Sequence, residues 1–162
     1  DRESVMPRWL TYVLAVLAAV LIILAIAAPI GPMPGLRIGG TPAEAPASWA
    51  GTQLPDEVLL ATYDGPLPYV VTIWVVESGG RLYVVGAPES TWVAKATNSS
   101  DVRVRINDAV YDMQATRMPP GRVDVLQAYV DRYQADYPEI IDGFPPLEEL
   151  AEGSALFELT PR

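Results

Sequence analysis

The sequence contains no cysteine and no histidine among its 162 residues. The chain therefore cannot assemble a Ser-His-Asp or Cys-His catalytic apparatus, a zinc site built from thiolate or imidazole, or a histidine general base. It also cannot form a structural disulfide, so cysteine usage carries no information about the redox compartment.

Positive charge is scarce, with 11 Lys and Arg residues against 20 Asp and Glu residues and a formal net charge of −9. The deficit lies in residues 38–162, because the preceding segment holds three arginines and two acids. A domain with this balance should repel nucleic acid, and we predict no nucleic-acid partner. The acidic surface favours solubility, with a basic protein partner as the alternative.

Charge is absent altogether between Arg8 and Arg37. Residues 9–30 supply the roughly 20 apolar residues that cross a hydrocarbon core, so we predict a transmembrane helix. Trp9 and Tyr12 would lie in an interfacial aromatic belt, and prolines from Pro29 onward would end the helix. A cleaved signal peptide, processed at AIAA, is the alternative. The first residue is Asp rather than Met, so we expect further sequence upstream.

The flanking arginines indicate an orientation. Arg2 and Arg8 precede the apolar run and Arg37 follows it, which favours a cytoplasmic amino terminus. We therefore predict a single-pass protein of the bacterial inner membrane, with the bilayer as a partner and the C-terminal domain in the periplasm.

One face of the predicted helix carries small residues at i, i+3, i+4 and i+7 spacing. Such a face lets neighbouring helices approach closely in lipid, so it predicts packing against other integral-membrane subunits. Alanine is also a common filler in bacterial anchors, which leaves a face without a partner as the alternative. The residues of this face are Ala15, Ala18, Ala19, Ile22 and Ala25.

The remainder of the chain divides at residue 56. Residues 31–56 are rich in Gly, Pro and Ala without a clear period, and we predict a tether that follows the anchor of residues 1–30. Residues 57–162 show short apolar or alternating runs typical of strands, plus helical periods. The predicted strands cover residues 57–64, 69–77, 81–86, 101–107, 109–118 and 155–160; a short helix follows Ser90, and an amphipathic helix lies within 119–137, with an apolar stripe of Val123, Leu126, Val130, Tyr133 and Tyr137.

The order of these elements resembles the FMN-binding split barrel, the fold of pyridoxamine 5′-phosphate oxidase and of deazaflavin-dependent nitroreductase-like proteins, in its membrane-anchored form. The resemblance covers about residues 36–160 and rests on order and spacing rather than on any one motif. It implies a mainly β domain, a split β-barrel with two or more packed helices, behind a single N-terminal transmembrane helix. The segments that carry it are GLRIGG, TIWVV, GRLYVV, STWV, DVRVRI and AVYDMQATRM.

The resemblance also implies a place for a cofactor. Split-barrel flavoproteins hold a flavin or deazaflavin ring against the barrel and fix its phosphate near the third strand and the following helix, so the redox chemistry needs no catalytic His or Cys. The matching residues here are Arg81, Ser90, Thr91, Trp92 and Lys95.

Those residues also have simpler interpretations, in which they bind no cofactor. Related anchored sequences carry an Arg-Asn pair where this chain has Ala94 and Lys95, so the phosphate-binding cations are depleted. Lys95 as a surface lysine, and Ser90 and Thr91 as ordinary capping residues, are the alternatives. Trp74 and Trp92 could stack on a flavin ring or belong to the core.

Carboxylate pairs, Glu148 with Glu149 and Asp131 with Asp136, have no ordered ligand set around them. We interpret them as solvated charge and predict no metal site.

Three functions compete. The first is a non-catalytic accessory subunit, structural or stabilising, of a larger membrane complex such as a respiratory or photosynthetic assembly, supported by the depleted cations and the alanine face. The second is a membrane-anchored FMN- or deazaflavin-dependent reductase of a quinone-like or other hydrophobic acceptor, supported by the fold. The third is a barrel that holds a flavin-like or heme-related molecule without turnover, although heme would lack its commonest axial ligands. We place the first ahead, and so predict no enzyme activity and no cofactor, with FMN or a deazaflavin as the alternative.

Overall fold

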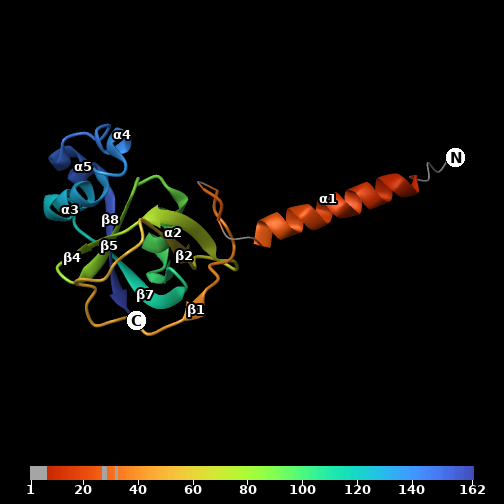
Figure 1. Ribbon diagram of the computed structural model, residues 1–162, viewed down its shortest axis with the longest axis horizontal. Helices are drawn as coiled ribbons and strands as arrows, with labels where there is room; N and C mark the ends of the chain where they lie inside the picture. Colours follow the sequence, from red (N-terminus) through yellow and green to blue (C-terminus); the bar gives the residue numbers. More distant parts are fainter. Residues whose placement is uncertain (1–6, 27–28, 32) are drawn as a thin grey trace.

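The computed structural model describes residues 7–26, 29–31 and 33–162. Its helices and strands form a curled antiparallel half-barrel sheet with helices packed against it (Figure 1). The helices are α1 (Arg8–Ile26), α2 (Thr91–Asn98), α3 (Val123–Tyr133), α4 (Pro138–Ile141) and α5 (Leu147–Gly153). The strands are β1 (Thr41–Pro42), β2 (Glu57–Thr62), β3 (Tyr69–Trp74), β4 (Val76–Ser78), β5 (Arg81–Gly86), β6 (Asp101–Ile106), β7 (Ala109–Arg117) and β8 (Ala155–Pro161).

The structure does not support the prediction of a transmembrane helix. Across the described parts of the chain, no helix combines the length and the apolar character that crossing a bilayer requires. Helix α1 begins at the charged Arg8 and ends at Ile26, before the predicted end at residue 30. The anchored fold class and the single-pass inner-membrane localisation were therefore wrong.

Among the described residues, no helix packs against the small-residue face of α1. Ala15, Ala18, Ala19 and Ile22 are all exposed, and the side chain of Ala25 lies outside the described residues. Packing of this face against another subunit is untested.

The sheet runs in the order β3-β2-β6-β7-β8-β5-β4, with antiparallel pairing throughout, and β1 adds a short parallel pair to β7. Strand β6 shows why it curls around a core. Val102, Val104 and Ile106 face the interior, while Arg103 and Arg105 face outward, as the alternation of the sequence predicts. The strand therefore contributes one apolar face to the barrel.

Two apolar clusters result. The first fills the barrel and includes Leu60, Leu82, Val104 and Phe157. The second lies outside β4, β5 and β8 and is covered by α3, α4 and α5, which group on that side in Figure 1. The helices therefore bury the outer face of one part of the sheet only.

Residues 69–77, predicted as one strand, divide into β3 and β4 at Val75. The main-chain N–H of Val75 donates to the Tyr133 hydroxyl at 3.1 Å, and that hydroxyl is 2.9 Å from the Val75 carbonyl oxygen. A side chain from α3 thus replaces the partners that a neighbouring strand would supply.

Parts of residues 33–56 lie against the barrel. Gly35 pairs with Val70 of β3, and Trp49 is 3% exposed within the barrel cluster. The main-chain N–H of Trp49 donates to the Gly80 carbonyl at 2.9 Å. The boundaries assigned to residues 1–30, 31–56 and 57–162 stay a prediction, but the part of the tether near Trp49 contributes to the core.

Candidate functional site

A cavity of about 320 Å³ opens where β3 and β5 approach each other beneath the helices. We call it the seam cavity. Thr72 and Trp74 come from β3, whereas Leu126 and Tyr129 come from α3. The full lining is Glu57, Thr72, Ile73, Trp74, Val85, Leu126, Tyr129, Phe144 and Leu150.

The Trp74 ring is held in place by aromatic neighbours. It stacks on Tyr133 with ring centroids 4.3 Å apart and an angle of 11° between the planes. Tyr137 packs at a tilt, with a centroid distance of 5.0 Å. Such pairs are stabilising beyond the area that they bury, so the indole is a pre-positioned wall of the cavity.

Tyr129 contributes its ring to the cavity and uses its hydroxyl elsewhere. The hydroxyl donates to the Trp74 carbonyl at 2.8 Å and lies 3.3 Å from the Tyr83 carbonyl. Burial raises the pKa of this hydroxyl well above its ordinary value, with a smaller contribution from Tyr133. Tyr129 is therefore neutral at physiological pH and ties α3 to the end of β3.

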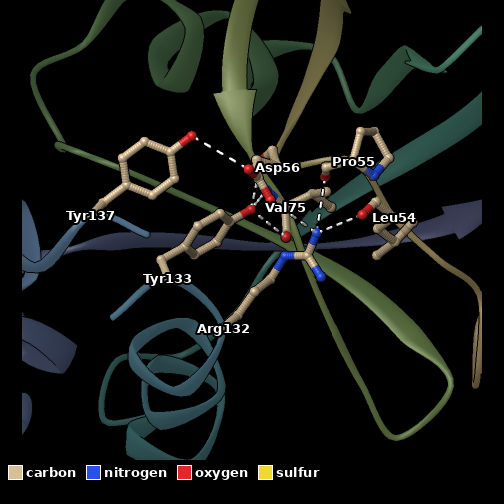
Figure 2. Close-up of polar contacts among 7 residues, drawn as sticks. All are labelled: Leu54, Pro55, Asp56, Val75, Arg132, Tyr133 and Tyr137. Atoms are coloured by element: carbon tan, nitrogen blue, oxygen red, sulfur yellow. Dashed lines mark hydrogen bonds and ion pairs between the residues drawn. The ribbon is translucent and has the colours of Figure 1, made fainter. Parts of the chain in front are cut away.

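Tyr133 fixes the same end of β3 from the next turn of α3 (Figure 2). Its side chain is fully buried, and its hydroxyl lies 2.7 Å from the Asp56 carbonyl as well as against Val75. Because Trp74 precedes Val75, this contact sets both the main chain and the indole of the cavity wall.

Arg132 makes a second connection, from α3 to the segment before β2. One guanidinium nitrogen donates to the carbonyl oxygens of Leu54 and Pro55, at 2.8 and 3.0 Å (Figure 2). The same nitrogen lies 3.9 Å from an Asp56 carboxylate oxygen. The Arg132 guanidinium therefore binds acceptors of the protein itself.

The lining of the seam cavity is mostly apolar and carries a single charged side chain, Glu57. Thr72 carries a hydroxyl and Trp74 an indole N–H, whereas the Tyr129 hydroxyl is bonded within the fold. Among the described residues, no lysine or arginine lines the cavity, so it offers an aromatic environment with one acidic side chain.

The two predicted cofactor cations lie outside this cavity and have partners of their own. Arg81 begins β5 and forms an ion pair with Glu158 at 2.5 Å. Lys95 donates to the Asp64 carbonyl at 2.7 Å, and its ammonium lies 5.9 Å from the centre of the Tyr69 ring. Cofactor binding by Arg81 and Lys95 stays a prediction.

The other three predicted residues surround the start of α2. Ser90 donates its hydroxyl hydrogen to the Ala87 carbonyl at 2.6 Å, and Thr91 is the first residue of the helix. Trp92 is 7% exposed and packs against Phe157 in the barrel cluster. Of the two tryptophans considered for flavin stacking, Trp74 lines the seam cavity and Trp92 belongs to the core. Cofactor binding by the α2 residues stays a prediction.

Sequence reasoning missed most of the lining because its members are far apart in the chain. Glu57 and Phe144 belong to segments with no evident connection, and Tyr129 was left off the predicted helical stripe. One signal was available: Leu126, Tyr129 and Tyr133 recur at i, i+3 and i+7 on α3. Of the lining residues, Trp74 was singled out beforehand as a candidate for ligand contact, and Leu126 was named as part of the apolar helical stripe.

Comparisons with solved structures identify the fold. A candidate pyridoxamine 5′-phosphate oxidase of Listeria innocua matches with a TM-score of 0.51 and 14% identity, over 67% of this chain and 85% of its own. HutZ, the heme storage protein of Vibrio cholerae, matches with a TM-score of 0.50 and 20% identity, over 66% of this chain and 82% of its own. A candidate 5-nitroimidazole antibiotic resistance protein of Bacteroides thetaiotaomicron matches with a TM-score of 0.50 and 12% identity, over 65% of this chain and 72% of its own.

No protein-family model matches the sequence, and no curated protein matches it. At these identities the structural likeness shows the fold alone. The split-barrel part of the resemblance is therefore confirmed, its membrane-anchored form is not supported, and neither the fold nor its neighbours point to a subunit of a membrane complex. The chain has a split-barrel fold like that of the candidate pyridoxamine 5′-phosphate oxidase.

Proposed function

We propose that the protein binds a planar aromatic small molecule of the flavin class in the seam cavity. The observation that carries the proposal is an aromatic-walled cavity, with Trp74, Tyr129 and Phe144 in its lining, on a split-barrel scaffold. Its volume of about 320 Å³ lies at the lower end of the roughly 300–1,000 Å³ of small-molecule sites. Apolar walls with few polar groups are also typical of such sites.

The ring of a flavin fits this lining, but the phosphate of FMN does not. A phosphate needs cations or a cluster of donors, whereas the one charged lining residue is Glu57. Arg81 and Lys95 are held by Glu158 and by the Asp64 carbonyl. We therefore expect recognition of the ring system, with phosphate-free flavins bound at least as tightly as FMN.

The role that we favour is binding without turnover. A phosphate anchor is part of how a flavoenzyme retains its cofactor, and its depletion here favours a holding or accessory protein over a reductase. HutZ, described as a heme storage protein, has a similar fold. Heme itself is a weaker candidate for this chain, because the sequence supplies neither His nor Cys as an axial ligand.

The test is a titration of the purified chain with lumiflavin, riboflavin and FMN, in which equilibrium dialysis and flavin fluorescence measure the binding. We expect saturable binding to one site, with FMN no tighter than riboflavin. Phe144→Ala should weaken lumiflavin binding roughly tenfold, equivalent to about 1.4 kcal/mol, because it removes an aromatic wall.

Ile140→Ala is the matched control. Ile140 lies on the neighbouring helix α4, is 45% exposed and does not line the cavity, so this variant should bind like the unmodified chain. A folded protein that binds none of the three flavins would contradict the proposal. Reduction of a quinone by the flavin-loaded protein, at a rate above that of free flavin, would establish the reductase alternative instead.

A further inference from the structure

Among the described residues, Glu57 is the one charged side chain that lines the seam cavity, and the sheet places it beside Trp74. Val58, the next residue of β2, is 2% exposed and belongs to the barrel cluster. Successive side chains of a strand point to opposite faces, so Glu57 points outward, to the face on which Tyr133 meets Trp74. Glu57 and Trp74 are direct partners across β2 and β3, and side chains in such a pair have Cβ atoms about 5 Å apart.

The carboxylate of Glu57 is exposed and is not neutralised by the fold. Within the described part of the chain, no lysine or arginine forms an ion pair with it. Arg132 lies 3.9 Å from the carboxylate of the neighbouring Asp56. The same guanidinium nitrogen donates to the carbonyl oxygens of Leu54 and Pro55 (Figure 2). Glu57 therefore brings an uncompensated negative charge to the cavity.

The surroundings of Trp74 add negative charge in the same place. Loss of hydration raises the pKa of the Tyr137 hydroxyl, whose ring packs on Trp74. Neighbouring carboxylates raise this pKa further; they belong to Asp56, Glu57 and Asp136. This part of the molecule therefore attracts cations, and the formal net charge of −9 acts in the same direction.

An indole ring and a carboxylate side by side favour one kind of ligand group. A cation gains a charge-assisted contact with the carboxylate and an attraction to the aromatic ring, for which tryptophan is the strongest partner. Tyr133 covers one face of the Trp74 ring, so a ligand in the cavity meets the indole from its remaining sides.

We infer that the ligand of the seam cavity carries a positively charged group, such as an ammonium on a short side chain of its ring, and that Glu57 and Trp74 bind this group. The inference rests on the proposed function and specifies the charge of the ligand. Glu57 is then the residue that determines specificity between cationic and anionic forms of the same ring.

The first test varies the charge of the ligand and leaves the protein unaltered. Three isoalloxazines share the 7,8-dimethyl ring system and differ in the substituent at N10, which is 2-aminoethyl, 2-hydroxyethyl or carboxymethyl. At neutral pH the amine is protonated and the carboxylic acid is ionised, so the series runs from cation to anion. At low salt, we expect the aminoethyl compound to bind at least about tenfold more tightly than the carboxymethyl compound, with the hydroxyethyl compound between them.

The second test changes Glu57. Glu57→Gln keeps the size of the side chain and removes its charge, so the ratio of the aminoethyl to the carboxymethyl affinity should fall to about twofold or less. Glu57→Asp keeps the charge, and the cation should still bind more tightly than the anion. Circular dichroism and urea unfolding establish that each variant is folded.

Glu139→Gln is the matched control, because it changes the net charge by the same amount. Glu139 lies on α4, is exposed and does not line the cavity. The affinity ratio of this variant should stay within about twofold of that of the unmodified chain, because exposed charges outside the cavity are screened by water and salt.

The outcomes separate the two proposals. Equal, saturable binding of the three isoalloxazines by the unmodified chain would overturn the charge inference and leave the proposed function standing. A ratio that survives Glu57→Gln, or that is lost equally in Glu139→Gln, would overturn the assignment to Glu57. Absence of binding by all three compounds would overturn both proposals. If Glu57→Gln does not fold, the ratios of the unmodified chain, Glu57→Asp and Glu139→Gln decide.

Discussion

At the scale of single residues, Tyr133 connects the helix side of the molecule to the seam cavity. Its hydroxyl meets Asp56 and Val75, and its ring supports Trp74 (Figure 2). Tyr137 lies one turn further along and reaches the Asp56 carboxylate at 3.4 Å. The two tyrosines therefore offer a matched pair, one with a buried hydroxyl and one with a long contact near the surface.

We expect Tyr133→Phe to lower the free energy of unfolding by about 1–3 kcal/mol, because the buried Val75 N–H loses its acceptor. Tyr137→Phe should change it by less than about 0.5 kcal/mol. Urea unfolding of the two variants and the unmodified chain measures both values. Similar losses in the two variants would show that the hydroxyl of Tyr133 has no special role.

Individual residues also show how far the candidate site could be predicted from the sequence. The alternation of residues 101–106 and the hairpin before Arg81 are local patterns, and both matched the structure. Trp74 and Trp92 looked equivalent in sequence, yet one lines the cavity and the other lies in the core. Their difference depends on which face of the sheet α3 covers, a long-range contact that no local period encodes.

At the scale of elements, the short strand β1 shows how a Gly- and Pro-rich segment becomes ordered. Thr41 donates its N–H to the Asp108 carbonyl, and Ala43 donates to Val110. Gly40 immediately precedes β1 with φ +81°, and an added Cβ would lie 2.6 Å from a Val110 methyl carbon and 2.8 Å from the Asp108 carbonyl oxygen. The close approach explains the glycine at this position.

Gly40→Ala should accordingly destabilise the fold more than Gly51→Ala. Gly51 has a similar φ of +75°, but a Cβ there would meet nothing within 4 Å. The left-handed conformation alone costs about 1–2 kcal/mol with alanine, and the contacts at Gly40 should add about 1–3 kcal/mol. Thermal and urea unfolding give the difference, and equal losses would mean that β1 separates from β7 at little cost.

Helix α3 was predicted as an element, but the face that it buries was not. The predicted stripe included Val123 and Val130, which are half-buried, whereas Val125 and Tyr129 are buried. A helix seen in isolation offers several apolar faces, and the surface against which it packs selects one. That selection placed Tyr129 in the seam cavity.

At the scale of the whole molecule, charge is the property that bears on partners. The formal net charge is −9, and several arginines are engaged by acids, as in the pairs Arg81 with Glu158 and Arg103 with Asp112. Arg103 also lies near the Tyr63 ring. The cations are thus partly neutralised at short range, and the field beyond the surface is negative.

We therefore expect no binding to DNA or RNA, even at low salt, where electrostatic attraction would be strongest. An electrophoretic mobility-shift titration with a mixed-sequence duplex and a single strand measures this. A shift that weakens as salt is raised would contradict the expectation and point to a local basic surface.

The sequence alone determined the properties that depend on local pattern and composition: the absence of His- and Cys-based chemistry, the acidic charge, and the order of strands and helices that resembles a split barrel. It did not determine that helix α1 spans Arg8–Ile26, or that Trp49 joins the core. The tertiary structure also decided the seam cavity, because Glu57, Thr72, Tyr129 and Phe144 meet only when the sheet curls and α3 docks on its outer face. The physical reason is that periodicity reports which side chains prefer burial, whereas the surface that buries them is supplied by residues far away in the chain.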